Sequence, residues 1–163
     1  MKKNYFLLLI LILLCSCQTV SPLPPPKPVL EDITVEKTWG MPYIWASING
    51  KRYQFLLDTG STGFLLTEKM VKESGLTYSK TNTMKASGIT GVVHLKSIKE
   101  VTLRLDNGIV LNVSDVAVTN KNGPGLLPYK FFEVLDVVWD VKNNKLIFKK
   151  DIPQSAAPNI ATQ

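Results

Sequence analysis

Residues 55–62 read Phe55-Leu56-Leu57-Asp58-Thr59-Gly60-Ser61-Thr62, an apolar run that leads directly into an acidic residue and a glycine. The apolar run predicts a buried strand, and the glycine predicts that this strand ends in a turn. The Asp58 carboxylate is therefore expected at a strand end, where apolar walls meet a cleft. A second carboxylate close to it would force the pair to share one proton, so that one acts as general base and the other as general acid.

The sequence around this stretch predicts antiparallel hairpins. Residues 43–48 and 52–57 are rich in β-formers and flank Asn49-Gly50, a pair that accepts the positive φ angles of a type I′ turn. Two further hairpins are predicted in the same way, one joining 101–105 to 109–113 and one joining 136–141 to 145–148.

Two short segments favour helix. Thr67 is a suitable cap for residues 68–74, and Gly75 is a suitable stop. Pro128 is predicted as the first helical residue of a segment that continues through 129–134. Short strands, hairpin turns and one or two short helices together predict a mostly β domain, a small closed β-barrel.

The first 17 residues predict an export signal. Two lysines precede an apolar run, Tyr5 to Leu14, whose ten residues would rise about 15 Å as a helix, half of a hydrocarbon core of about 30 Å. The sequence Leu14-Cys15-Ser16-Cys17 resembles the bacterial lipobox. The resemblance implies cleavage before Cys17 and attachment of a lipid to Cys17. The alternative is an ordinary secretion signal with incidental cysteines.

The predicted organisation follows from these signals. Residues 1–16 are the lipoprotein signal peptide, and residues 17–32 are the lipidated cysteine with a linker whose prolines favour an extended polyproline II stalk. Residues 33–151 form the folded domain, and 152–163 are expected to be a flexible tail. Gln18, which follows the lipidated cysteine, favours the outer membrane facing the periplasm if the host is Gram-negative.

Several kinds of chemistry are excluded by composition. The cysteines are Cys15 and Cys17, so the predicted domain has no disulfide, cysteine nucleophile or thiolate metal site. With His94 as the one histidine, a multi-histidine metal site is excluded too, and no metal or organic cofactor is expected. A serine-hydrolase triad with His94 is not favoured, because the sequence has no Gly-x-Ser-x-Gly elbow and His94 falls on a predicted flap strand, where a surface or subsite histidine is expected. The lysines are scattered, so no nucleic-acid partner is expected.

Residues 43–148 resemble the retropepsin-like aspartic peptidases. Asp58-Thr59-Gly60-Ser61 matches the catalytic motif of this family, and it follows an apolar strand as it does there. The resemblance implies that Asp58 is catalytic and that Thr59 forms hydrogen bonds across a dimer. It also implies that Gly60 contributes backbone and that Ser61 supports the outer carboxylate oxygen.

Other segments extend the resemblance. Residues 86–92, with Gly88, Ile89, Thr90 and Gly91, stand where the family has its flap, a hairpin that closes over substrate. Near the end of the domain, residues 125–132 resemble the family's strand of two hydrophobic residues and a glycine, together with the helix that follows this strand. This sequence departs from the family pattern at Pro128, where the family has a glycine. The proline ring adds bulk and removes an N–H close to the turn that carries Asp58.

The resemblance implies a membrane-anchored aspartic endopeptidase that cleaves a peptide or protein substrate. Because the chain has one Asp-Thr-Gly, the active unit is expected to be a homodimer with one Asp58 from each copy. Two alternatives remain: a catalytically inactive lipoprotein of the same fold that binds a peptide or protein, and a purely structural envelope lipoprotein.

Overall fold

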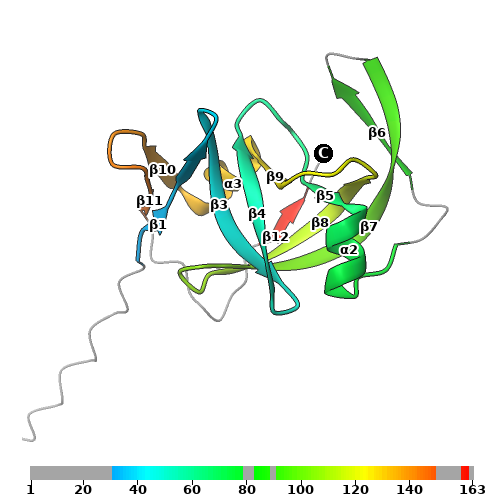
Figure 1. Ribbon diagram of the computed structural model, residues 1–163, viewed down its shortest axis with the longest axis horizontal. Coiled ribbons are helices and arrows are strands. Elements are labelled where there is room, and N and C mark those ends of the chain that lie inside the picture. The colour runs from blue at the N-terminus through cyan, green and yellow to red at the C-terminus, as the bar shows by residue number, and fades with distance from the viewer. Residues whose placement is uncertain (1–30, 79–82, 89–90, 150–158, 162–163) are drawn as a thin grey trace, which may run out of the picture.

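The computed structural model describes residues 31–78, 83–88, 91–149 and 159–161 (Figure 1). The strands are β1 Ile33–Thr34, β2 Glu36–Thr38, β3 Met41–Ile48, β4 Lys51–Asp58, β5 Leu65–Thr67, β6 Thr83–Gly88, β7 Gly91–Leu105, β8 Val110–Thr119, β9 Gly125–Pro128, β10 Val137–Asp140, β11 Lys145–Phe148 and β12 Asn159–Ala161. The helices are α2 Glu68–Ser74 and α3 Tyr129–Leu135.

Six strands close into a ring. Around it, β3 pairs with β4, β4 with β9, β9 with β5, β5 with β8 and β8 with β7, and β7 returns to β3. A separate sheet of three strands, in the order β1-β11-β10, lies beside the ring (Figure 1). The predicted fold class, a mostly β domain built on a small closed barrel with two short helices, is confirmed.

The three predicted hairpins are present. The first turns at Asn49-Gly50, whose φ angles of 49° and 78° are those that a type I′ turn requires. The second, β7–β8, is longer than predicted because its ladder continues to Lys96 opposite Val118. The third, β10–β11, begins one residue later than predicted, because Asp136 has a φ of 49° and ends α3 in the left-handed conformation.

Both predicted helices are present as well. The Thr67 side chain accepts a hydrogen bond from the Met70 backbone N–H, and Gly75, with a φ of 71°, ends α2. The prediction that Pro128 is the first helical residue is wrong. Pro128 pairs with Asp58 as the last residue of β9, so its ψ is an extended 174° and it serves as the residue that precedes α3.

Alternating side chains of the barrel strands fill one core. Along β3 and β4, every second side chain points inward, and long apolar side chains from the other strands and both helices complete the interior. The largest fully buried side chains are those of Phe55, Phe64, Phe131, Ile44, Ile48, Leu66, Leu103, Leu105, Ile109, Leu111, Leu127 and Leu135. Each such burial contributes about 1.5–3 kcal/mol relative to an exposed side chain.

The prediction that residues 152–163 are a flexible tail is wrong for 159–161. These residues form β12, which pairs in parallel with β8, and the Ile160 side chain is 0% exposed. A lone isoleucine among small polar residues has no periodicity that reveals a strand, and its partner lies some fifty positions earlier in the chain. The predicted signal peptide, Cys17 and nearly all of the predicted linker lie outside the described residues. Within the described ranges, neither helix is long and apolar enough to cross a membrane.

Candidate active site

The parallel pairing of β4 with β9 places Asp58. In this ladder Phe55 is opposite Gly125, Leu57 is opposite Leu127, and Asp58 is opposite Pro128. Gly125 is required here, because a Cβ atom on it would collide with the ring of Phe55. The ladder therefore holds the end of β4, and with it Asp58, against the start of α3.

The Asp58 carboxylate is half-buried and oriented by its own turn. Oδ1 accepts a hydrogen bond of 2.9 Å from the Gly60 N–H, and the Asp58 carbonyl accepts one of 3.1 Å from the Ser61 N–H. A Cβ atom on Gly60 would lie 3.3 Å from Oδ1, tighter than an ordinary contact. The backbone role predicted for Gly60 is thus consistent with a close approach between this residue and the carboxylate.

Ser61 braces the turn that carries Asp58. Its hydroxyl donates to the Gly63 carbonyl at 3.0 Å and accepts from the Gly63 N–H at 3.3 Å. Its own carbonyl accepts a hydrogen bond of 3.2 Å from the Tyr129 N–H. The hydroxyl of Ser61 is therefore engaged within the loop in this single chain, and its predicted support of the outer carboxylate oxygen stays a prediction. The Thr59 side chain is exposed, so its predicted contact across a dimer likewise stays a prediction.

Pro128 is buried opposite Asp58. The hydrogen bond from this part of the chain to the Asp58 loop comes from the next residue, Tyr129. The missing N–H of Pro128 therefore leaves that bond in place, although the ring still adds bulk where the family pattern has glycine.

The predicted flap is a hairpin of β6 and β7. Its register pairs Gly88 with Gly91, and the tip residues Ile89 and Thr90 lie outside the described residues. His94 is exposed on the β7 side of the hairpin, opposite Lys85, as expected for a flap residue. Figure 1 shows that the hairpin projects beyond the barrel, on the side where the loop after β4 also lies.

The register explains why Asp58 and the flap share one end of the barrel. The two ladder pairs between β3 and β7 are Ala46 with Leu105 and Ser47 with Arg104, close to the Asn49 turn. The other ends of β7 and β4, which carry the flap and Asp58, therefore both extend away from that turn.

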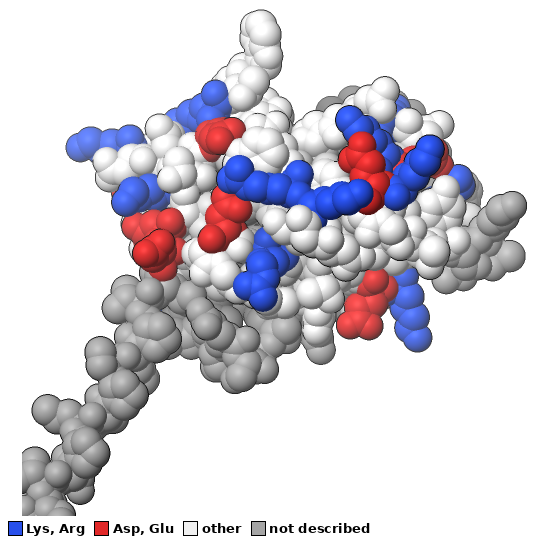
Figure 2. Space-filling view, turned by 60° about the horizontal axis from the view of Figure 1, so that its bottom comes forward, with Lys and Arg blue, Asp and Glu red and all other residues white. Residues whose placement is uncertain are grey.

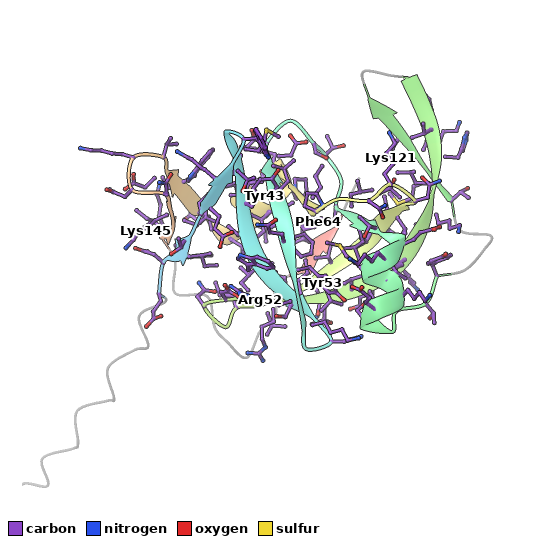
Figure 3. The ribbon with its side chains drawn as sticks, viewed as in Figure 1. Tyr43, Arg52, Tyr53, Phe64, Lys121 and Lys145 are labelled. Atoms are coloured by element: carbon purple, nitrogen blue, oxygen red, sulfur yellow. The ribbon has the colours of Figure 1, made fainter. Side chains whose placement is uncertain are left out.

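Three exposed apolar side chains at the Asp58 end were not assigned a role from sequence. Trp39 is 96% exposed, Tyr129 is 57% exposed and Met41 is 45% exposed. The Tyr129 N–H bonds the Asp58 loop. Continuing the β3–β4 register from Tyr43 opposite Leu56 brings Met41 level with Asp58. Figure 3 shows Tyr43 on the half of the β3–β4 hairpin away from Arg52 and Tyr53. The sequence signal that could have revealed Trp39 was Gly40, because a glycine after it predicts a tight turn, and a tight turn places Trp39 at an exposed hairpin tip.

Charged groups are mixed over the surface. Figure 2 shows basic and acidic side chains interspersed on one face, and ion pairs such as Arg52–Asp106 at 2.6 Å and Lys145–Asp32 at 3.5 Å join some of them. The expectation of no nucleic-acid partner stays a prediction. Among the residues that the structure describes, no three His, Cys, Asp or Glu side chains are grouped so that they could hold a metal ion.

A family model described as "Aspartyl protease" matches residues 44–131, more than half of the chain. The chain belongs to this aspartyl protease family. The match spans the Asp58 loop, the flap, β9 and the start of α3, whereas Trp39 and Met41 precede it. Membership of the family indicates a general function of the aspartic protease type, that of a hydrolase.

Among solved structures, the chain is similar to the retroviral protease-like domain of Ddi1 from Leishmania major. The two are 17% identical, the likeness covers 67% of this chain and 90% of that chain, and the TM-score is 0.49. No functionally curated protein matches the sequence.

Proposed function

We propose that this member of the aspartyl protease family is a lipid-anchored endopeptidase of the bacterial envelope, active as a homodimer with Asp58 from each copy. The observation that carries the proposal is the placement of Asp58. Its half-buried carboxylate is fixed by the Gly60 N–H at the end of β4, on the side of the barrel from which the flap projects.

The dimer follows from the number of carboxylates that the chemistry needs. Hydrolysis by an activated water requires one group that accepts a proton and one that donates a proton. The chain has one Asp-Thr-Gly, so a second copy would supply the partner carboxylate around a two-fold axis. The exposed Trp39, Met41 and Tyr129 at the same end support this association, because large apolar side chains exposed together favour contact with another protein.

The two carboxylates would then share one proton, since like charges at contact distance repel. The unprotonated one would take a proton from a water that attacks the peptide carbonyl. The protonated one would hydrogen-bond to that carbonyl oxygen and a proton would then pass to the leaving amine. The flap would exclude bulk water and hold an extended peptide over the pair, with no metal or organic cofactor.

The anchor is the lipid on Cys17, supported by the lipobox-like sequence and the proline-rich stretch before the domain. Confinement to a membrane surface raises the local concentration of copies, which helps a weak dimer to assemble. In cells, Cys17→Ser should leave a precursor that no longer incorporates labelled fatty acid. Unchanged labelling in Cys17→Ser would refute the anchor.

The activity is tested with the full-length chain in detergent, a mixed peptide library and a pH series from about 4 to 8. We expect cleavage with a bell-shaped pH dependence, in which both limbs belong to the carboxylate pair. Product analysis by mass spectrometry identifies the bonds cut. Absence of cleavage by the wild type over the whole range would contradict the peptidase proposal.

A catalytically inactive peptide- or protein-binding lipoprotein is the second candidate. Pro128, buried opposite Asp58, is the observation that favours it, because its ring occupies space where the family pattern has the smallest residue. In that case the wild type would not cleave, and Asp58→Asn would bind library peptides as tightly as the wild type does.

A further inference from the structure

Lys96 is the residue at which β7 leaves the barrel and enters the flap. Before it, the described part of β7 pairs with β6; after it, β7 pairs with β8. Lys96 itself pairs with Thr83 of β6 on one side and with Val118 of β8 on the other. A rotation of the flap against the barrel must therefore pivot close to this residue.

The Lys96 side chain joins the flap base to the helix beside it. Its ammonium donates a hydrogen bond of 2.7 Å to Glu68 Oε1 and one of 3.0 Å to the Tyr78 hydroxyl, and it lies 4.7 Å from the centre of the Tyr78 ring. Glu68 is the first residue of α2, which the Thr67 cap fixes to β5. The hydrogen bond to Glu68, and then that to Tyr78, raise the pKa of Lys96.

Within the described parts of the hairpin, no side chain from Thr83 to Ala86 or from Gly91 to Lys96 is buried in the core. On the described β7 side of the flap, the residues from Gly91 to His94 are all exposed. The hairpin is held by its own ladder, which sets its internal shape but not its angle to the barrel. Contacts at its base are therefore the ones that set this angle.

We propose that Glu68, Tyr78 and Lys96 form a flap-base cluster that sets the angle of the β6–β7 hairpin over Asp58. The proposal rests on the proposed peptidase function, because only a flap that closes over substrate makes the angle matter for turnover. Lys96 is a positioning residue in this scheme: it acts on bound peptide through the flap and leaves the Asp58 loop unchanged.

A second cluster with the same three kinds of group provides a matched control. Arg52 pairs with Asp106 at 2.6 Å and lies 4.6 Å from the ring centre of Trp45, so it too joins a cation, a carboxylate and an aromatic ring. Both clusters are at the surface, and the side chains of both ion pairs keep comparable exposure. Figure 3 shows Arg52 towards the end of β4 that is remote from the flap.

The experiment compares full-length wild type with Lys96→Met, Lys96→Arg, Glu68→Gln, Tyr78→Phe and the control Arg52→Met, all in detergent. Two properties are measured: cleavage of fluorescein-labelled casein, and hydrogen exchange of the backbone amides in residues 83–88 and 91–95. For Lys96→Met we expect KM to rise about threefold to tenfold, with kcat within about twofold of wild type. Exchange in the flap should rise by a similar factor, while exchange in the barrel stays unchanged.

The other variants grade the effect. Lys96→Arg keeps a cation and should restore most of the flap protection, whereas Tyr78→Phe keeps the ring and loses one hydrogen bond, so it should give the smallest change. Arg52→Met should leave both flap exchange and KM unchanged.

Hydrogen exchange separates failure of this inference from failure of the proposed activity. If the wild type does not cleave casein but Lys96→Met loosens the flap, the peptidase proposal fails and the role of the cluster in setting the flap stands. Unaltered flap exchange in Lys96→Met would overturn the inference whether or not the protein cleaves. Flap loosening with an unaltered KM in an active enzyme would overturn the positioning role, and equal loosening by Arg52→Met would do so as well.

Discussion

Two turns with nearly the same φ angles lie at opposite ends of β3. Asn49-Gly50 leads into β4, with φ angles of 49° and 78°, and Trp39-Gly40 leads from β2, with φ angles of 54° and 75°. Asn49 suits this conformation, and its side chain donates a hydrogen bond of 2.9 Å to the Ser74 carbonyl at the end of α2. Trp39 is 96% exposed, and its left-handed backbone conformation costs a residue with a bulky side chain about 1–2 kcal/mol.

The two ends of the barrel therefore differ: the Asn49 end is held by hydrogen bonds to α2, and the Trp39 end carries the candidate site. At the Asn49 end, the Lys51 side chain also bonds the Glu73 carbonyl, so the hairpin and α2 fix each other. At the Trp39 end lie Asp58, a buried proline beside it and exposed apolar side chains. A strained backbone that carries an exposed aromatic side chain is typical of a functional surface.

The largest effect is expected from Asp58→Asn at the Trp39 end. The substitution keeps the shape of the side chain and its hydrogen bond from Gly60, but an amide does not accept the proton of the attacking water. Cleavage should fall by at least about a hundredfold to ten-thousandfold, while the melting temperature stays close to that of wild type. Cleavage that survives in Asp58→Asn, with contaminating proteases excluded, would place the chemistry on another residue.

Gly125→Ala is expected to weaken the whole Asp58 end, because the added methyl group would collide with Phe55 inside the β4–β9 ladder. Overpacking of this kind lowers the free energy of unfolding by about 1–3 kcal/mol or more. Gly63→Ala is the matched control, since a Cβ atom there would meet nothing within 4 Å. Chemical denaturation measures both; equal stability of the two variants would show that β9 moves aside without loss.

Trp39→Asn makes the two turns of β3 alike. We expect a slightly more stable monomer, by about 0.5–1 kcal/mol, because Asn accepts the left-handed conformation that Trp resists. If Trp39 packs against a second copy, self-association should weaken by about tenfold to thirtyfold, since a buried aromatic anchor contributes about 2 kcal/mol. Sedimentation at rising concentration, with thermal unfolding beside it, tests both. A dimer affinity equal to that of wild type would remove Trp39 from the interface.

The smallest effect is expected from Asn49→Ala at the other end. It removes the hydrogen bond to Ser74 and places a Cβ-bearing residue without a turn-forming side chain at positive φ. The free energy of unfolding should fall by about 1 kcal/mol, with catalysis unchanged because the Asp58 loop is remote. A loss of kcat in this variant would mean that the two ends of the barrel are coupled.

Local chemistry explains what was predicted correctly from sequence. The apolar run before Asp58, the Asn49-Gly50 turn, the Thr67 cap and the Gly75 stop are each decided by a few neighbouring residues. The Asp58 loop was predicted as a candidate site for the same reason, because the apolar strand, the acidic residue and the glycine follow one another directly in the sequence.

Contacts between distant parts of the chain explain what was missed. That Pro128 ends β9 rather than starting α3 depends on its pairing with Asp58, seventy positions earlier. The burial of Ile160 depends on β8, and the location of Lys96 between flap and barrel depends on two strands that the sequence does not align. The sequence by itself therefore determined the strands of the three hairpins, their turns and the acid. Only the tertiary structure decided which strands pair, which side chains remain exposed and which residues adjoin Asp58, because these depend on the register of long-range ladders.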